Sequence, residues 1–103
     1  MDFNKKLRDD AVDNLFKGIL LLENVEECYR FFEDICTVGE LKALAQRFQV
    51  AKMLKEGSTY NDIVEKTGAS TATISRVKRF LNYGADGYNI ILDRLKKQEE
   101  HNN

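Results

Sequence analysis

The sequence has 103 residues with a formal net charge of −1, and 43% of its residues are hydrophobic, which fits one domain with a modest core. No apolar run approaches the roughly 18 residues that span a bilayer, and the N-terminal segment lacks the apolar stretch of a signal peptide, so we expect a cytoplasmic protein with no membrane partner. The chain contains no proline, so no residue of this kind interrupts a helix.

The first part of the chain is expected to form two helices, over residues 4–22 and 25–36, separated by Asn24. Apolar residues recur in the first helix at spacings of three and four, which is the period of an amphipathic helix. The runs at residues 20–22 and 31–32 place apolar side chains on more than one side, which is more than a small monomer readily covers. Because exposed patches of this kind mark interfaces, we expect a homodimer in which these helices pack between subunits.

A third helix is expected over residues 38–56, because Thr37 and Glu40 have the spacing of a capping box and Gly57 can end the helix. No segment alternates with the period of a strand, so the sequence predicts an all-α chain of six helices in one domain over residues 1–103. The remaining elements are, in order, a helix over 59–67, a helix over 70–82, a turn, a helix over 88–98 and a polar tail over 99–103.

Residues 59–82 have the pattern of a helix-turn-helix, in which two short helices are joined by a tight turn. Thr59 and Asp62 fit a capping box at the start of the first helix. Gly68 stands where the chain leaves that helix and must take a positive φ, which glycine adopts at little steric cost. Ser70 can cap the second helix by accepting a hydrogen bond from a backbone amide of its first turn.

The second helix of this motif has one apolar face and one face suited to DNA. Ile74 and Val77 lie three residues apart and are expected to face inward. The outward side chains are small, hydroxylic or basic, and such a face can enter a major groove and meet phosphates and base edges. Residues 66–83 contain four basic side chains and no acidic one, although the whole chain is slightly acidic. The alternative interpretation is an ordinary solvated helix face.

We predict that this motif binds double-stranded DNA. The side chains expected to contact base edges or phosphates, called the contact surface below, are Asn61, Lys66, Ser70, Thr71, Ala72, Ser75, Lys78 and Arg79.

Catalytic and metal-binding motifs are missing from the sequence. Cys28 and Cys36 belong to no metal-ligand pattern and are expected to be half-buried apolar groups, while His101 lies in the polar tail. There is no glycine-rich phosphate loop and no pairing of a nucleophile with a histidine. We therefore expect no enzyme, no cofactor and no metal site.

From Leu41-x-x-Leu44-x-x-Arg47 to the run over residues 70–76, the chain resembles the Trp repressor superfamily, and in particular its YerC/YecD-type branch. The resemblance covers roughly residues 15–95. It implies a Trp-repressor-like fold of six helices, an intertwined homodimer, and a transcriptional repressor that binds operator DNA. It also implies that Thr71, Ala72 and Ser75 read bases.

The resemblance further implies an effector pocket between helices. In the family the corepressor's indole lies between two arginines, which match Arg47 and Arg76, and a contacting threonine matches Thr73. A glycine and a serine of the family's pocket are replaced by Val77 and Phe80, whose larger side chains would fill the space of an indole. These replacements argue against tryptophan, so we expect either no effector or a smaller one.

The sequence therefore predicts a DNA-binding transcriptional regulator, with a repressor role implied by the resemblance, that binds a palindromic operator as a dimer without tryptophan. The alternative is a protein-interaction adaptor that keeps the helix-turn-helix shape, since a fold does not dictate a function. Binding to generic duplex DNA at low salt distinguishes the two, because only the regulator should show it.

Overall fold

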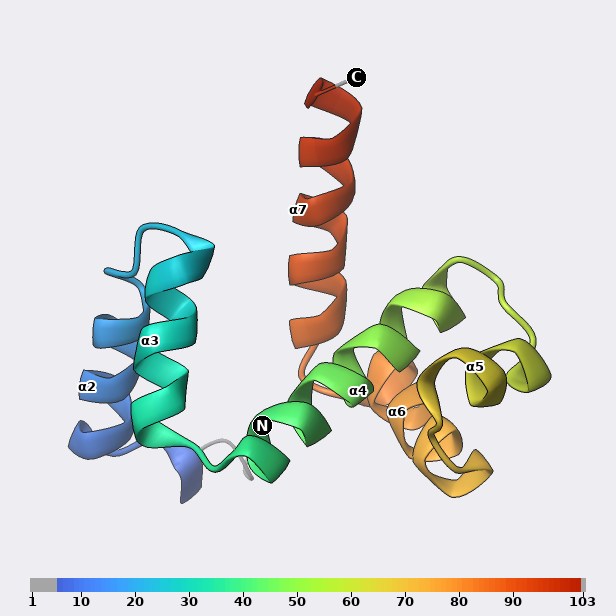
Figure 1. Cartoon of the computed structure of the whole chain (residues 1–103), viewed down its shortest axis with the longest axis horizontal. Coiled ribbons are helices and arrows are strands. Elements are labelled where there is room, and N and C mark those ends of the chain that lie inside the picture. Colours follow the sequence, from blue (N-terminus) through green and yellow to red (C-terminus); the bar gives the residue numbers. More distant parts are fainter. Residues whose placement is uncertain (1–5, 103) are drawn as a thin grey trace. The chain divides into compact units, whose positions relative to one another are not determined.

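The computed structural model describes residues 6–102, which form six full helices and no strand (Figure 1). This confirms the prediction of an all-α fold. No helix among these residues is both long and apolar enough to cross a membrane. The helices are α2 (Asp10–Ile19), α3 (Val25–Ile35), α4 (Val38–Lys55), α5 (Tyr60–Thr67), α6 (Thr71–Tyr83) and α7 (Gly87–Asn102).

The first helix is shorter than the expected range 4–22, of which residues 4 and 5 lie outside the described residues. It begins at Asp10, because the carboxylate of Asp9 accepts a hydrogen bond from the backbone N–H of Val12 at 2.8 Å and so caps a new helix start. It ends at Ile19, before the leucine run over residues 20–22. Residues 6 and 7 are helical as well, but residues 8 and 9 interrupt the expected helix, and its expected end was three residues too late.

The last helix is longer than the expected range 88–98. It runs from Gly87 to Asn102, so most of the expected polar tail is helical, while residue 103 lies outside the described residues. Lysine, glutamine and glutamate are good helix formers, and a polar end needs no buried face to remain helical. The bounds of the four helices between these two differ from expectation by no more than one residue at either end.

The chain divides into two compact units, Met1–Val38 and Gly39–Asn103. In the N-terminal unit neither α2 nor α3 has a buried side chain, and the large apolar residues Leu20 and Leu21 are 83% and 79% exposed. Two short helices cannot enclose a core by themselves. That both units belong to the single domain expected over residues 1–103 stays a prediction.

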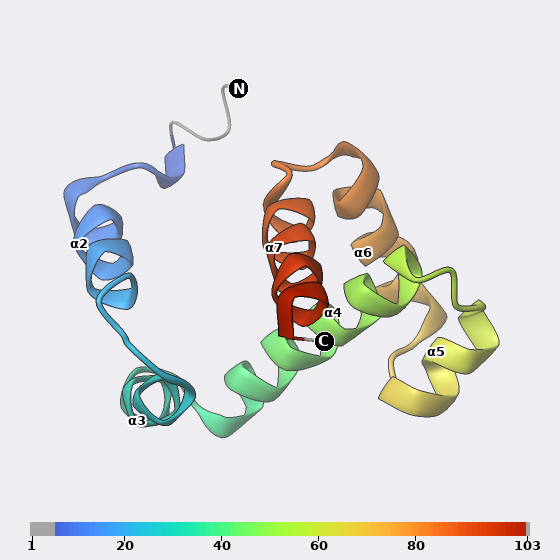
Figure 2. The ribbon, with the colours of Figure 1, turned by 90° about the horizontal axis from the view of Figure 1, so that it is seen from above.

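The C-terminal unit holds the buried core of the described residues. Its central members come from α4, α5 and α6, where Val50, Ile63 and Ile74 are fully buried. Helix α6 lies between α5 and α7, in contact with both, as Figures 1 and 2 show from two directions. The core therefore packs the helix-turn-helix, α5 and α6, against α4. Its members are Val50, Ala51, Met53, Ile63, Ala69, Ile74, Val77 and Leu92.

Candidate nucleic-acid interface

Helix α5, the first helix of the motif, begins at a side-chain cap. The hydroxyl oxygen of Thr59 accepts a hydrogen bond from the backbone N–H of Asp62 at 3.2 Å, which satisfies one of the free amides at a helix start. Ile63 is fully buried and anchors α5 in the core. Helix α5 therefore has the predicted cap at Thr59, and Ile63 is buried as predicted.

The turn between α5 and α6 depends on Gly68 and Ser70. Gly68 has a φ of +72°, and its N–H donates to the carbonyl of Val64 at 2.9 Å, which ends α5. Ser70 then caps α6, because its hydroxyl oxygen accepts from the backbone N–H of Thr73 at 3.1 Å. The Ser70 hydroxyl also lies 3.1 Å from the Thr73 hydroxyl, which closes a small polar ring at the start of α6.

The eight residues of the predicted contact surface all have exposed side chains. On α6 the separation of faces is sharp, since Ile74 is 0% and Val77 is 2% exposed while the residues that follow them, Ser75 and Lys78, are exposed. Helix α6 thus presents hydroxyl, methyl and basic groups to solvent on one side and packs into the core on the other. This is the division that a helix entering a major groove needs.

The electrostatics of the motif favour an anionic partner locally. Lys66, Arg76, Lys78 and Arg79 are the charged residues of the stretch 66–83, which contains no carboxylate. The ammonium of Lys78 lies over the ring of Tyr60, 5.8 Å from its centroid, so α5 helps to hold a positive charge beside α6. Local fields of this kind govern the attraction of phosphates more than net charge does.

Four of the five residues expected around an effector line one cavity of about 230 Å³. Arg47 comes from α4, while Arg76, Val77 and Phe80 come from α6. This cavity is called the arginine cavity below. Thr73, the fifth expected residue, does not line it; it is half-buried and contacts Ser70.

Sequence reasoning missed Tyr88, which forms a wall of the arginine cavity from the start of α7. Its aromatic side chain follows Gly87 and is half-buried against the core. Apolar periodicity could suggest that Tyr88 is buried, but nothing in the local pattern indicates that α7 begins beside the middle of α6.

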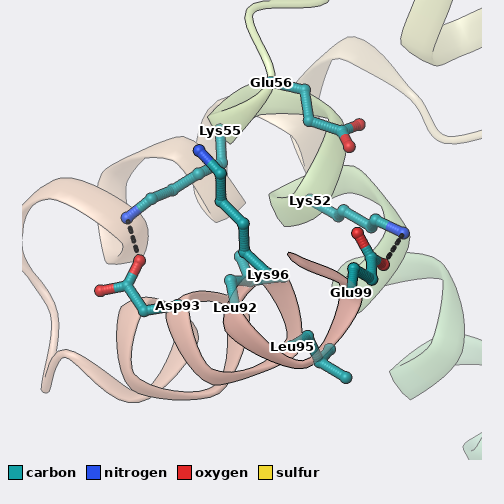
Figure 3. A pocket seen from close by; sticks show the side chains of 8 residues that line it. All are labelled: Lys52, Lys55, Glu56, Leu92, Asp93, Leu95, Lys96 and Glu99. Atoms are coloured by element: carbon teal, nitrogen blue, oxygen red, sulfur yellow. Dashed lines mark ion pairs between the residues drawn. The ribbon is translucent and has the colours of Figure 1, made fainter. Parts of the chain in front are cut away.

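A second cavity, of about 280 Å³, lies between α4 and α7 and has a mixed charged lining (Figure 3). Two ion pairs cross it, with 4.0 Å between Lys52 Nζ and Glu99 Oε1 and 3.6 Å between Lys55 Nζ and Asp93 Oδ1. Exposed pairs of this kind contribute little stability individually. They nevertheless connect α7 to the last turns of α4.

The two cysteines form no disulfide with each other. Cys28 and Cys36 are free and half-buried. Within residues 6–102, no group of three or more histidine, cysteine, aspartate or glutamate side chains is placed to hold a metal ion.

Comparison with known proteins identifies close relatives. The family model described as Trp repressor protein matches residues 10–96. An uncharacterised protein of Bacillus subtilis, YerC, is 61% identical over 94 residues, which cover 91% of this chain and 90% of YerC.

Two solved structures are similar over most of their length. A crystal structure from Staphylococcus aureus, provisionally named a Trp repressor, is 61% identical with a TM-score of 0.86, and the match covers 89% of this chain and 92% of the other. A TrpR-like protein from Eubacterium eligens is 60% identical with a TM-score of 0.87, and the match covers 89% of this chain and 95% of the other.

Proposed function

Because this chain belongs to the Trp repressor protein family, we propose that it is a sequence-specific transcriptional regulator that reads double-stranded DNA with α6. The family is one of helix-turn-helix DNA-binding regulators rather than enzymes. The observation that carries the proposal is the outer face of α6, where all predicted contact residues of this helix are exposed while Ile74 and Val77 are buried.

The residues of the contact surface have two proposed roles, which are contact with bases and contact with phosphates. Thr71, Ala72 and Ser75 stand on the first turns of α6, where hydroxyls can exchange hydrogen bonds with base edges and a methyl group can meet thymine. The basic side chains of Lys66, Lys78 and Arg79, with Asn61 and Ser70, hold phosphates and set the register. Base contacts then discriminate sequence, while phosphate contacts supply affinity for any duplex.

We further propose that the protein acts as a homodimeric repressor on a near-palindromic operator. The apolar side chains of α2 and α3 that remain exposed in the N-terminal unit support a dimer, because a second subunit would cover them. A two-fold dimer presents two copies of α6 to successive major grooves, about 34–36 Å apart.

Regulation by tryptophan is not part of the proposal. Val77 and Phe80 stand on the α6 wall of the arginine cavity, and their side chains compete with an indole for its space. We expect calorimetric titration with tryptophan to give no binding heat, and operator affinity to be the same with and without millimolar tryptophan. Micromolar binding of tryptophan would contradict this part of the proposal.

Selection of bound duplexes from a random pool tests the function directly. We expect enrichment of one near-palindromic site with half-sites about one helical turn apart, and a steep loss of affinity with added salt. A protein that selects no sequence and does not bind generic duplex at low salt would instead be an adaptor, and the proposal would be wrong.

A further inference from the structure

A side chain of α4 is hydrogen-bonded to the end of α5. The Nε2 of Gln46 donates to the backbone carbonyl oxygen of Thr67 at 3.0 Å, across 21 residues of sequence. Thr67 is the last residue of α5, and the last carbonyls of a helix have no partner within it. The half-buried Gln46 amide therefore satisfies a helix-end carbonyl and joins two elements at the same time.

Thr67 belongs to the turn that leads into α6. Its hydroxyl donates to the carbonyl of Ile63 at 2.7 Å and accepts from the backbone N–H of Ala69 at 3.1 Å. Gly68 and Ser70 complete the turn with the backbone and capping bonds described above. Because these bonds are local, they make the turn rigid within itself but do not set its position on α4.

The core beneath the turn is apolar, and apolar contact alone leaves the orientation of the turn on α4 partly free. Ala69 packs there with a side chain of one methyl group, and apolar contact is non-directional. A hydrogen bond to a carbonyl has a required distance and direction. The Gln46–Thr67 bond therefore selects one orientation of the turn, and α6 starts four residues after Thr67.

We propose that Gln46 is a positioning residue for DNA recognition, which touches no DNA but holds the start of α6 in the orientation that reads bases. This inference rests on the proposed function. Groups that recognise a partner must be held to within about 0.5 Å of their productive geometry, whereas phosphate contacts by long basic side chains tolerate a small rotation. Loss of Gln46 should therefore reduce sequence discrimination more than affinity for DNA in general.

The test uses Gln46→Met, which keeps the length and apolar stem but cannot donate, and Gln46→Glu, which is isosteric and presents a carboxylate to the carbonyl. Gln49→Met, at an exposed position of the same helix, is the matched control. The dissociation constant is measured for the selected duplex and for a scrambled duplex, at a temperature well below unfolding. Amide hydrogen exchange at residues 67–70 is measured on the free protein.

We expect both Gln46 variants to lower the ratio of selected to scrambled affinity, on the order of tenfold, which is the size of one lost hydrogen bond. In Gln46→Met, affinity for the scrambled duplex and its salt dependence should stay at the wild-type values. The added carboxylate of Gln46→Glu repels the phosphates of both duplexes alike, so for that variant the affinity ratio is the readout. Amides 67–70 should exchange faster, and Gln49→Met should match the wild type. If Gln46→Met does not fold, Gln46→Glu decides the result.

A folded variant that keeps the wild-type affinity ratio would overturn the inference, even if its melting temperature fell, because Gln46 would then serve stability alone. Such a result leaves the proposed function intact, since the wild-type protein still selects its site. A wild-type protein that binds no duplex would overturn both.

Discussion

At the scale of single residues, the chemistry of α6 differs between the two faces of the helix. Ile74 and Val77 are buried, whereas Ser75 and Lys78, their neighbours along the chain, are exposed. A helix of 3.6 residues per turn places side chains three and four positions apart on the same face, so one short sequence can serve the core and a partner together. Contact residues can therefore be exchanged with little effect on the fold.

Two substitutions on this face should have different effects on DNA binding. Arg79→Ala should weaken binding to all duplexes and reduce the salt slope by about one, because one phosphate contact is lost. Ser75→Ala should keep the salt slope and change the preferred sequence, because it alters a base contact. Binding isotherms at several salt concentrations and repeated site selection measure the two effects. Arg94→Ala, an exposed arginine on α7, should change neither.

Ser70 combines a capping role with a proposed place on the contact surface, and two substitutions separate these roles. Ser70→Ala should lower the free energy of unfolding by about 0.5–2 kcal/mol, because α6 loses its cap. Ser70→Asp should keep the cap, and its charge is favourable at a helix N-terminus, but it should weaken binding to every duplex by repelling phosphate.

Urea unfolding and DNA titration measure the two quantities for each Ser70 variant. Asn24→Asp, which changes the cap of α3 in the same way, is the control and should leave DNA binding unchanged. Equal DNA affinity of Ser70→Asp and the wild type would remove Ser70 from the contact surface.

At the scale of elements, the connection between α6 and α7 is tightly specified. Asn89 Nδ2 donates to the carbonyl of Leu81 at 3.0 Å and to the carboxylate of Asp86 at 2.9 Å, which ties the start of α7 to the end of α6. Asp86 has a φ of +71°, in the left-handed region. The turn therefore fixes the direction of α7, and this direction brings Tyr88 to the arginine cavity.

The two glycines of this turn should respond oppositely to alanine. At Gly84 a Cβ would collide with the carbonyl oxygen of Phe80, so Gly84→Ala should destabilise the protein by more than about 1 kcal/mol. At Gly87, the first residue of α7, a Cβ would meet nothing within 4 Å, so Gly87→Ala should stabilise by about 0.4–1 kcal/mol. Urea unfolding of both variants measures the difference, and a destabilised Gly87→Ala protein would contradict the argument.

At the scale of the whole molecule, the two units differ in how much apolar surface they bury. The C-terminal unit has a core of eight buried residues, whereas α2 and α3 have no buried side chain. Burying apolar surface stabilises by roughly 25 cal/mol per Å², so an uncovered pair of apolar helices leaves favourable free energy unused. A second subunit that covers them is the simplest source of that energy.

We therefore predict a dimer in solution at micromolar concentration, measured by sedimentation equilibrium. Replacing Leu20 and Leu21 together by glutamate should produce monomers and abolish binding to the palindromic site, because charges would be buried at the interface. Asn14→Glu, an exposed change on α2, should remain dimeric. A wild-type protein that sediments as a monomer at this concentration would contradict the proposed assembly.

Features that depend on neighbours along the chain could be predicted from the amino-acid pattern alone. The all-α class, the left-handed Gly68, the cap at Ser70 and the buried pair Ile74 and Val77 follow from periodicity and local hydrogen bonding, and the structure confirms them. The Trp repressor family was also identified from sequence motifs, and the family match over residues 10–96 confirms it. Local signals were weakest at the two end helices, whose bounds were wrong.

Contacts between residues far apart in the chain became known only from the packing of the helices. The bond from Gln46 to Thr67 and the approach of Tyr88 to Arg47 depend on how α4, α6 and α7 cross, and no local pattern encodes a crossing. Apolar periodicity indicates which face of a helix is buried but not against which partner, because burial is non-directional. The sequence thus identified the side chains of α6 that face solvent, while the tertiary structure decided which side chains hold that helix in place.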